Sequence, residues 1–360
     1  MPVSRSPNDL EATAFARRPR RRFGLVLAVV FALTAALATH IYHLFSAPAP
    51  QATRQVEFEI EPGWGANRVA DALADEGLIR HRQLFTLWLR FRQIDRALGE
   101  GVYELGPNMN MAEVAQVLEQ GGQPRVASVV VPEGFRAGEV AARLAAAEVG
   151  PMDEFLRLIQ DPGELRPEFL PEGAGLEGYL FPASYDIPVR SGPGDAIAAM
   201  LGRFERELDD GTLASLEALG LTVHDWVTLA SIVQAEAAND EEMPVIAGVF
   251  LNRLDEDMLL QSDPTVAYGL GIRMNELNRY EGHFTVSADH PWNTYTRPGL
   301  PAGPIGNPGR EALASVLNAS RVNAEGQPNL YFMHSRDGSV FKVNTNLEDH
   351  ERDVARYLRP

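Results

Sequence analysis

The sequence contains no cysteine, and this absence excludes several kinds of site at once. Without thiols the chain forms no disulfide framework, no thiolate metal site and no cysteine nucleophile. The HExxH, P-loop and GxSxG signatures are also missing, and the 8 histidines are scattered without the spacing of metal ligands. The sequence therefore gives no reason to expect a metal ion or a cofactor.

Basic residues are scarce and unevenly placed. The 360 residues include 32 Lys and Arg against 49 Asp and Glu, which gives a formal net charge of -17. Counting places about +4 on residues 1–22, so the rest of the chain carries about -21. An acidic body argues against nucleic-acid binding, because phosphate contacts need a basic face. The length and the 45% hydrophobic content suit two or three domains with at least one large core.

Residues 23–45 contain no Asp, Glu, Lys or Arg and are strongly apolar. A helix of about 20 such residues crosses the ~30 Å hydrocarbon core of a bilayer. The alternative is a cleaved signal peptide, which the Ser-Ala-Pro-Ala sequence at 46–49 keeps open, although the apolar run exceeds the usual signal core of about 7–15 residues. We expect an uncleaved anchor. Its basic flank at 1–22 predicts a cytoplasmic tail and a body outside the cytoplasm.

Beyond a proline-containing linker at 46–55, alternating apolar and polar residues predict strands at 56–60 and 101–105, with two amphipathic helices between them. The segment at 129–137 resembles the segment at 60–66. Each contains the end of a predicted strand and a glycine turn, followed by a predicted helix. A real repeat would make two tandem strand–helix modules. The alternative is that such segments resemble one another in general. Neither segment contains a set of residues of catalytic type.

A candidate acid lies near the end of a predicted helix. Thr222 and Asp225 fit a capping box, so the helix should begin there. Its apolar stripe consists of Trp226, Leu229, Ile232 and Val233. Glu236 continues this stripe rather than the solvated face, whereas Gln234 lies off the line. Desolvation favours the neutral carboxyl that a general acid needs near neutral pH. The alternative is that Glu236 faces water at the helix end.

The next helix is predicted to begin near Asp240, with Asn252 and Arg253 on its flanks as ordinary surface residues. Residues 260–269 then form a loop that leads into a helix, where Ser262 or Asp263 is the expected N-cap.

Residues 293–305 are too rich in proline and glycine for regular structure. The segment offers amide, hydroxyl and aromatic groups of the kinds that bind sugars. The alternative is a surface crossover without a binding role.

Taken together, these motifs resemble the MltG (YceG-like) family of endolytic murein transglycosylases over nearly the whole chain after the linker. The motifs are VPEG at 131–134, LEGYLFP at 176–182, LASIVQAE at 229–236, FLNRL at 250–254, LQSDPTVAYG at 260–269, NTY at 293–295, GLPAGPI at 299–305, LYF at 330–332 and NTNLEDH at 344–350. Several long motifs in the same order make the resemblance specific.

The resemblance implies a single-pass inner-membrane enzyme with a periplasmic body and an α+β fold. We expect a LysM-like βααβ module at 56–124 and a YceG-like catalytic domain at 125–360. The catalytic domain would contain a second βα module at about 125–215 and a catalytic helix region at 222–360. The implied reaction cuts the MurNAc-GlcNAc bond of nascent strands without water, leaves 1,6-anhydro-MurNAc ends and limits strand length. The implied partners are peptidoglycan glycan strands and peptidoglycan synthases, without a cofactor.

Family members often carry glutamates at both positions that Gln234 and Glu236 occupy here, so the resemblance assigns catalysis to Glu236. One carboxyl suffices, because it protonates the leaving oxygen and then accepts a proton from the sugar's own hydroxyl. Glu177 and Asp263 are the nearest rivals for a second acid, which a glycosidase would need. The predicted substrate-binding residues are Asn252, Gln261, Asp263, Asn293, Tyr295 and Glu177. The alternatives are a muramidase-type hydrolase and a non-catalytic peptidoglycan-binding scaffold.

Overall fold

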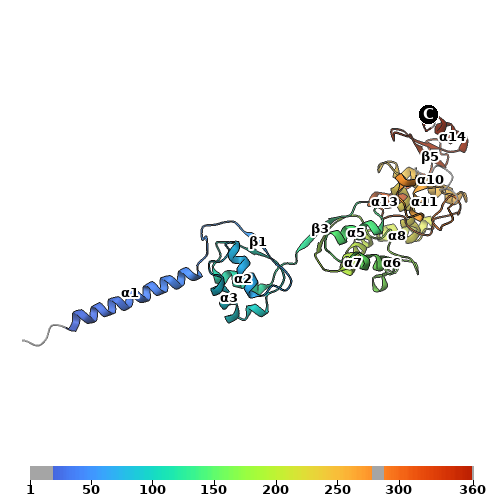
Figure 1. Ribbon diagram of the computed structural model, residues 1–360. Coiled ribbons are helices and arrows are strands. Elements are labelled where there is room, and N and C mark those ends of the chain that lie inside the picture. The colour runs from blue at the N-terminus through green and yellow to red at the C-terminus, as the bar shows by residue number, and fades with distance from the viewer. Residues whose placement is uncertain (1–18, 278–287, 359–360) are drawn as a thin grey trace, which may run out of the picture. The chain divides into compact units, whose positions relative to one another are not determined.

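The computed structural model describes residues 19–277 and 288–358. The chain divides into two compact units, Met1–Arg125 and Val126–Pro360, which are described separately below. The fold is mixed α+β, and the strands in the described part of the chain form small two-stranded sheets (Figure 1). Of the expected cytoplasmic tail, residues 1–18 lie outside the described residues.

The first unit begins with α1 (Pro19–Phe45), a single continuous helix (Figure 1, blue). Residues 24–45 of this helix carry no formal charge, and 22 residues of α-helix span about 33 Å. The apolar side chains of α1 are largely exposed, as in Phe31 at 75% and Leu33 at 65%. The structure thus confirms an apolar helix long enough to cross a bilayer, whether it acts as an anchor or as a signal.

The strands of the first unit follow the predicted alternation. β1 (Val56–Ile60) pairs antiparallel with β2 (Gly101–Leu105), and Phe58 and Ile60 point into the core. The helices of this unit after α1 are α2 (Ala66–Asp75), α3 (Arg82–Phe91), the 3-10 turn η1 (Ile94–Arg96) and α4 (Met111–Gln120). The order β1-α2-α3-β2 therefore encloses a small hydrophobic core of its own.

The second unit is larger and mainly helical. β3 (Val126–Val130) pairs antiparallel with β4 (Ser184–Pro188), and β5 (Tyr331–His334) pairs antiparallel with β6 (Phe341–Asn344). Its helices are α5 (Ala137–Ala146), α6 (Met152–Gln160), η2 (Gly163–Leu165), α7 (Pro193–Phe204), η3 (Glu205–Glu207), α8 (Asp210–Leu219), α9 (Val223–Glu236), α10 (Met243–Asp255), α11 (Asp263–Gly269), α12 (Met274–Leu277), α13 (Arg310–Leu317) and α14 (Leu347–Tyr357).

The two strand–helix segments that repeat in the sequence also share a backbone feature. Gly63, between β1 and α2, has φ +80°, and Gly134, between β3 and α5, has φ +73°. This left-handed conformation favours glycine at the turn in both segments. The shared turn explains why the two segments have similar sequences.

The helix α9 lies inside the second unit. Its capping box is as predicted: the Thr222 hydroxyl accepts from the Asp225 amide at 3.1 Å, and the Asp225 carboxylate accepts from the Thr222 amide at 3.0 Å. Every residue from Trp226 to Val233 is buried, so this stretch has no solvated face. The predicted stripe is therefore one side of a helix that is covered all round by neighbours that include α10 and α13.

The expectation that Asn252 and Arg253 are surface residues is wrong. Both lie on α10, which begins at Met243 rather than near Asp240, and they are only 6% and 7% exposed. Helical spacing placed them on the flanks of α10, but the segment at 320–330 packs over that flank and covers them.

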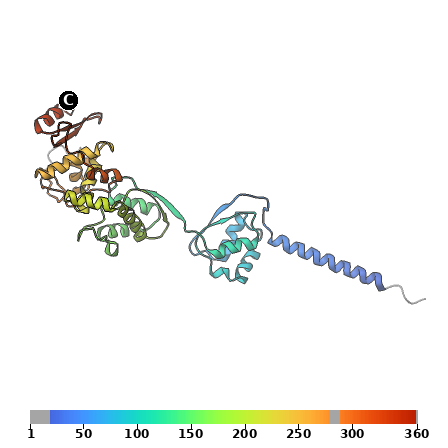
Figure 2. The same cartoon turned by 180° about the vertical axis from the view of Figure 1, so that it is seen from behind.

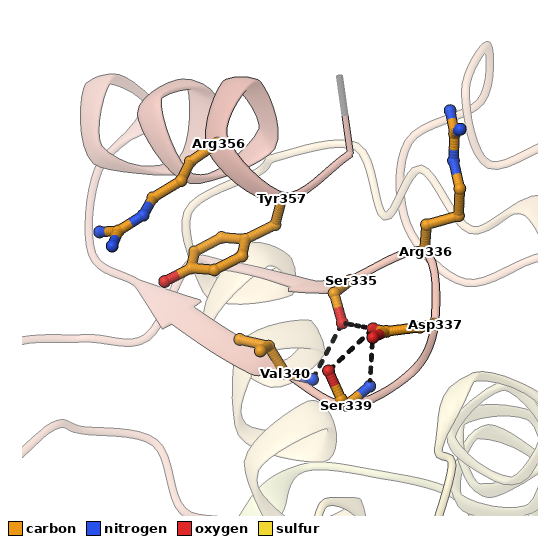
Figure 3. Close-up of a pocket in the computed structure, with 7 residues that line it drawn as sticks. All are labelled: Ser335, Arg336, Asp337, Ser339, Val340, Arg356 and Tyr357. Atoms are coloured by element: carbon orange, nitrogen blue, oxygen red, sulfur yellow. Dashed lines mark hydrogen bonds between the residues drawn. The ribbon is translucent and has the colours of Figure 1, made fainter. Parts of the chain in front are cut away.

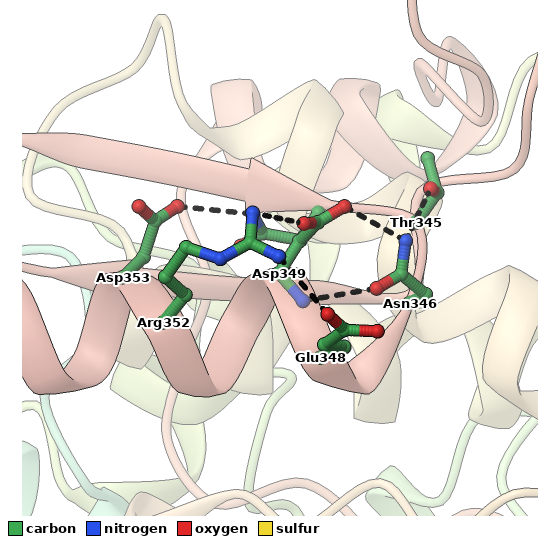
Figure 4. Close-up of polar contacts among 7 residues, drawn as sticks. Thr345, Asn346, Glu348, Asp349, Arg352 and Asp353 are labelled. Atoms are coloured by element: carbon green, nitrogen blue, oxygen red, sulfur yellow. Dashed lines mark hydrogen bonds and ion pairs between the residues drawn. The ribbon is translucent and has the colours of Figure 1, made fainter.

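The C-terminal part of the second unit packs α14 against the β5–β6 hairpin, as both views show (Figures 1 and 2). Asn346 caps α14 by accepting from the Asp349 amide at 2.9 Å (Figure 4). Asn344 donates to Asp353 at 3.0 Å. Arg352 donates to Asp349 at 2.6 Å in the first turns of the same helix. The Asn344–Asp353 hydrogen bond joins the hairpin to α14, and the other two contacts stabilise the start of the helix.

Candidate active site

Glu236 is the last residue of α9, and its carboxyl meets the start of α11. Ser262 donates a hydrogen bond from its hydroxyl to Oε1 of Glu236 at 2.6 Å. Ser262 is the N-cap of α11, but its hydroxyl makes no capping bond. The side chain that local sequence rules assign to capping is therefore directed at the predicted catalytic acid instead.

Two buried threonines fix the position of Ser262. Its amide donates to the hydroxyl of Thr294 at 2.9 Å, and its carbonyl accepts from the hydroxyl of Thr265 at 2.6 Å. The two threonine hydroxyls are 2.9 Å apart. Because the one hydroxyl proton of Thr265 goes to Ser262, Thr294 is the donor between them. The serine is thus held from α11 and from the irregular segment at 293–305.

The pKa of Glu236 is raised to about 7, and burial is the largest cause. The hydrogen bond from Ser262 lowers the pKa, the negative charge of Asp263 raises it, and the charges of His334 and Arg253 lower it. The side chain is half-buried in the structure. A carboxyl with a pKa near neutrality is present in both forms at physiological pH, so it can donate and then accept a proton.

Asp263 and Tyr295 form a second pair beside Ser262. Tyr295 donates from its hydroxyl to Oδ1 of Asp263 at 2.7 Å. Asp263 is exposed and Tyr295 is half-buried, so these polar groups lie at the surface next to the Glu236–Ser262 pair. Gln261 is also exposed and has φ +52°, a conformation that non-glycine residues adopt at a cost and that clusters at functional sites.

The predicted binding residues Asn252 and Asn293 are buried and engaged with the backbone. Asn252 donates to the carbonyls of Arg321 at 2.7 Å and Asn329 at 2.8 Å, and it accepts from the Arg321 guanidinium at 2.8 Å. Asn293 donates to Ala288 at 2.7 Å and accepts from the Tyr295 amide at 2.9 Å. Their side chains hold the protein around the site, and their amides do not face solvent.

Glu177 lies in a different group of contacts. It accepts from the Ala137 amide at 2.8 Å, from the Tyr268 hydroxyl at 3.1 Å and from the Asn307 side chain at 3.3 Å. Its pKa is raised to about 7, with burial as the largest cause, while the hydrogen bonds from the Ala137 amide and Tyr268 and the charge of Arg136 lower it. Helix α11 carries both Tyr268, which contacts Glu177, and Asp263, which lies beside the Glu236–Ser262 pair.

Gln234, two residues before Glu236 on α9, points elsewhere. Its side-chain oxygen accepts from the Gly309 amide at 2.9 Å, at the N-terminus of α13. Gln234 therefore serves the packing of α9 against α13 and does not contact Ser262.

Sequence reasoning missed Ser262, Thr265, Thr294 and Arg253 as members of the site. Arg253 donates to the carbonyls of Leu260 at 2.7 Å and of Leu330 at 2.8 Å, which holds the chain just before Ser262. The one signal for Ser262 was its place before the Asp-Pro pair, and that signal indicates capping. Among the described residues, no group of three or more His, Asp or Glu is arranged to hold a metal ion.

A surface pocket of about 440 Å³ lies at the β5–β6 turn and the end of α14 (Figure 3). Asp337 accepts there from the Ser335 hydroxyl at 2.7 Å and the Ser339 hydroxyl at 2.8 Å, and these hydrogen bonds lower its pKa to about 2. None of the predicted catalytic or binding residues lines this pocket. It is separate from the group around Glu236.

The fold and the site define an α+β protein with an apolar N-terminal helix and a carboxyl group of near-neutral pKa at the end of a buried helix. The chain belongs to the YceG-like family, whose model matches residues 58–356. It is 30% identical to a protein named endolytic murein transglycosylase from Streptococcus pneumoniae, over 85% of this chain and 59% of that protein. The chain thus spans less than two thirds of that relative's length.

Two further comparisons cover more of the matched protein. A Bacillus subtilis protein, also named endolytic murein transglycosylase, is 26% identical over 84% of this chain and 85% of its own length. The crystal structure of a YceG-like protein from Listeria monocytogenes matches with 26% identity and a TM-score of 0.54, over 84% of this chain and 99% of that one. The predicted family is therefore confirmed.

Proposed function

We propose that this protein is an endolytic murein transglycosylase that uses Glu236 as its single acid–base group. It cleaves the MurNAc-GlcNAc bond within nascent glycan strands, leaves 1,6-anhydro-MurNAc ends and so limits strand length. The family membership and the names of the relatives support the reaction. The observation that carries the assignment to Glu236 is its 2.6 Å hydrogen bond from Ser262 together with a pKa raised to about 7.

Glu236 transfers a proton twice in this mechanism, first as an acid and then as a base. Protonated Glu236 donates to the glycosidic oxygen as the bond to the anomeric carbon breaks, and the leaving sugar keeps that proton. The carboxylate then takes the proton from the 6-hydroxyl of the MurNAc residue as that oxygen bonds to the anomeric carbon. Glu236 is thereby returned to its protonated form, and no water is consumed.

The neighbouring groups have supporting roles. Ser262 donates to the carboxylate and stabilises the form that Glu236 takes between the two proton transfers. The exposed group of Gln261, Asp263 and Tyr295 is placed to contact the sugar. Asn252, Asn293 and Glu177 act as positioning residues, because their polar atoms are already committed within the protein.

The remaining parts of the chain suit an enzyme that works close to a membrane. Residues 23–45 form a single anchor, with residues 1–22 in the cytoplasm and the body in the periplasm. Residues 56–124 form a LysM-like module, for which the β1-α2-α3-β2 order is the support, and residues 125–360 form the catalytic domain. An anchored enzyme reaches the newly made strands, so its partners are peptidoglycan glycan strands and the synthases that make them.

The test is mass spectrometry of the products that the full-length protein in detergent forms from uncrosslinked glycan strands. We expect products lighter by one water than hydrolysis products, and their loss in Glu236→Gln. Glu241→Gln is the matched control, because it removes an exposed carboxylate close by in the chain. Reducing ends would indicate a muramidase-type hydrolase, and intact strands that still bind the protein would indicate a scaffold.

A further inference from the structure

The outer surface of α3 is apolar although nothing in the described protein covers it. Leu87 and Phe91 are 61% and 78% exposed, while Phe85 and Leu89 on the opposite side are fully buried in the core of the first unit. Trp88 lies between the two sides, with its ring 6.0 Å from that of Phe91. The helix therefore has one apolar face in the core and a second one in solvent.

The same segment is basic in an acidic chain. Residues 80–96 contain one acidic residue, Asp95, and carry about +4 by counting, whereas the whole chain carries -17. The arginines are Arg80, Arg82, Arg90, Arg92 and Arg96. The side chains of Arg82 and Arg92 are 62% and 48% exposed, and each also pairs at 3.4 Å with an exposed carboxylate, of Asp71 and Glu119 respectively. Arginine combined with tryptophan, phenylalanine and leucine on one helix is typical of helices that lie in a membrane interface.

This surface lies directly at the end of the apolar helix α1. Phe45, the last residue of α1, packs its ring on the edge of Trp88 at a centroid distance of 5.4 Å. Arg80 donates to the carbonyls of Ala47 at 2.9 Å and Pro48 at 2.8 Å, and so fixes the chain where it leaves α1. Wherever α1 leaves a bilayer, α3 is therefore at the same level.

A pocket of about 420 Å³ lies at this junction, and its lining residues are His40, His43, Leu44, Arg80 and His81. Imidazole and guanidinium groups are hydrogen-bond donors suited to a phosphate. The pocket thus joins the last turns of α1 to the residues that precede α3.

We propose that α3 lies in the headgroup layer of the outer face of the membrane that α1 crosses. Leu87, Trp88 and Phe91 contact the upper part of the acyl chains, and the pocket beside Arg80 and His81 holds the phosphate of an anionic phospholipid. Tryptophan prefers this interfacial level, and basic residues are attracted to anionic lipid. The proposal rests on the proposed anchor, and it assigns residues 56–124 to the membrane surface rather than to the mature wall.

The lack of cysteine allows a direct test with single spin labels on the full-length protein in phosphatidylglycerol vesicles. Phe91→Cys reports on α3, Gln116→Cys on the exposed side of α4 is the matched control, and Leu33→Cys reports on the anchor. Electron paramagnetic resonance measures the ratio of oxygen to water-soluble nickel accessibility. We expect this ratio to be several-fold higher at 91 than at 116. We also expect it to fall in phosphatidylcholine vesicles and in the Arg82→Gln/Arg92→Gln variant.

The spin labels distinguish a failure of the proposed docking of α3 from a failure of the proposed anchor. A lipid-embedded label at 33 with a water-exposed label at 91 would overturn the docking of α3 while leaving the anchor intact. A water-exposed label at 33 would overturn the anchor and the docking together. Equal immersion at 91 in both lipids would overturn the role given to the arginines and to the phosphate pocket.

Discussion

Replacing Ser262 with alanine tests the central contact of the proposed site. The substitution removes the hydroxyl that donates to Glu236 at 2.6 Å, and leaves the backbone contacts of residue 262 with Thr294 and Thr265 in place. A hydrogen bond to a charged group contributes about 1.5–3 kcal/mol. Since 1.36 kcal/mol corresponds to about one pKa unit, the pKa of Glu236 should rise from about 7 by about one to two units.

The expected consequence is a change in both rate and pH dependence. The acid form of Glu236 persists to higher pH, so the optimum for anhydro-product formation moves upward by about one to two units. The carboxylate form is less stable, so the maximum rate falls by about tenfold or more. The assay is the initial rate of anhydro-ended product between about pH 5 and pH 9, with the full-length protein in detergent.

The matched control for this experiment is Ser315→Ala. Ser315 is 3% exposed and donates only to the Ala312 carbonyl of its own helix at 2.7 Å, so its loss removes a buried hydroxyl away from Glu236. We expect the control to keep the wild-type pH profile. An unchanged optimum in Ser262→Ala, or the same shift in the control, would refute the argument that Ser262 sets the pKa of Glu236.

Three further outcomes follow from the same contacts. Because burial raises the pKa of Glu177 to about 7, its contribution to stability is complete below about pH 4.5 and is lost as the pH rises through 7; Glu177→Gln should therefore flatten the decline of Tm over this range. The Gln234→Glu/Glu236→Gln double variant should stay inactive in the product assay, because the side chain at 234 faces Gly309. Asn252→Ala should lower the free energy of unfolding by about 2–3 kcal/mol in denaturant titrations, since it leaves two buried carbonyls without their donor and removes one acceptor of the Arg321 guanidinium, which keeps Asp255.

Local patterns in the sequence predicted the parts of the fold that depend on near neighbours. The charge-free run at 23–45 lies within one helix, the alternation at 56–60 and 101–105 gave strands with those bounds, and Thr222 starts α9 through its capping box. Each of these features depends on residues within one or two turns. The family could be recognised for the same reason, because its motifs are short continuous segments.

Local sequence patterns did not predict the environment of the candidate acid. Helical spacing singled out Glu236. The hydroxyl that donates a hydrogen bond to Glu236 belongs to Ser262, which lies 26 positions further along the chain. Local chemistry offered Ser262 or Asp263 as the N-cap and assigned Asn252 and Arg253 to the surface. In the structure Ser262 holds the N-cap position, but its hydroxyl is directed at Glu236, and Asn252 and Arg253 are buried. Asn252 and Arg253 are buried because the chain 69 to 77 residues later folds over them.

The sequence by itself determined where β1, β2 and α9 begin, which run is apolar enough to cross a membrane, and which family the chain belongs to. The tertiary structure alone decided which hydroxyl meets Glu236, why its pKa is near 7, and that the second face of α3 stays uncovered beside the end of α1. The physical reason is that desolvation and hydrogen bonding depend on which distant segments pack together, and helical or strand periodicity carries no information about those partners.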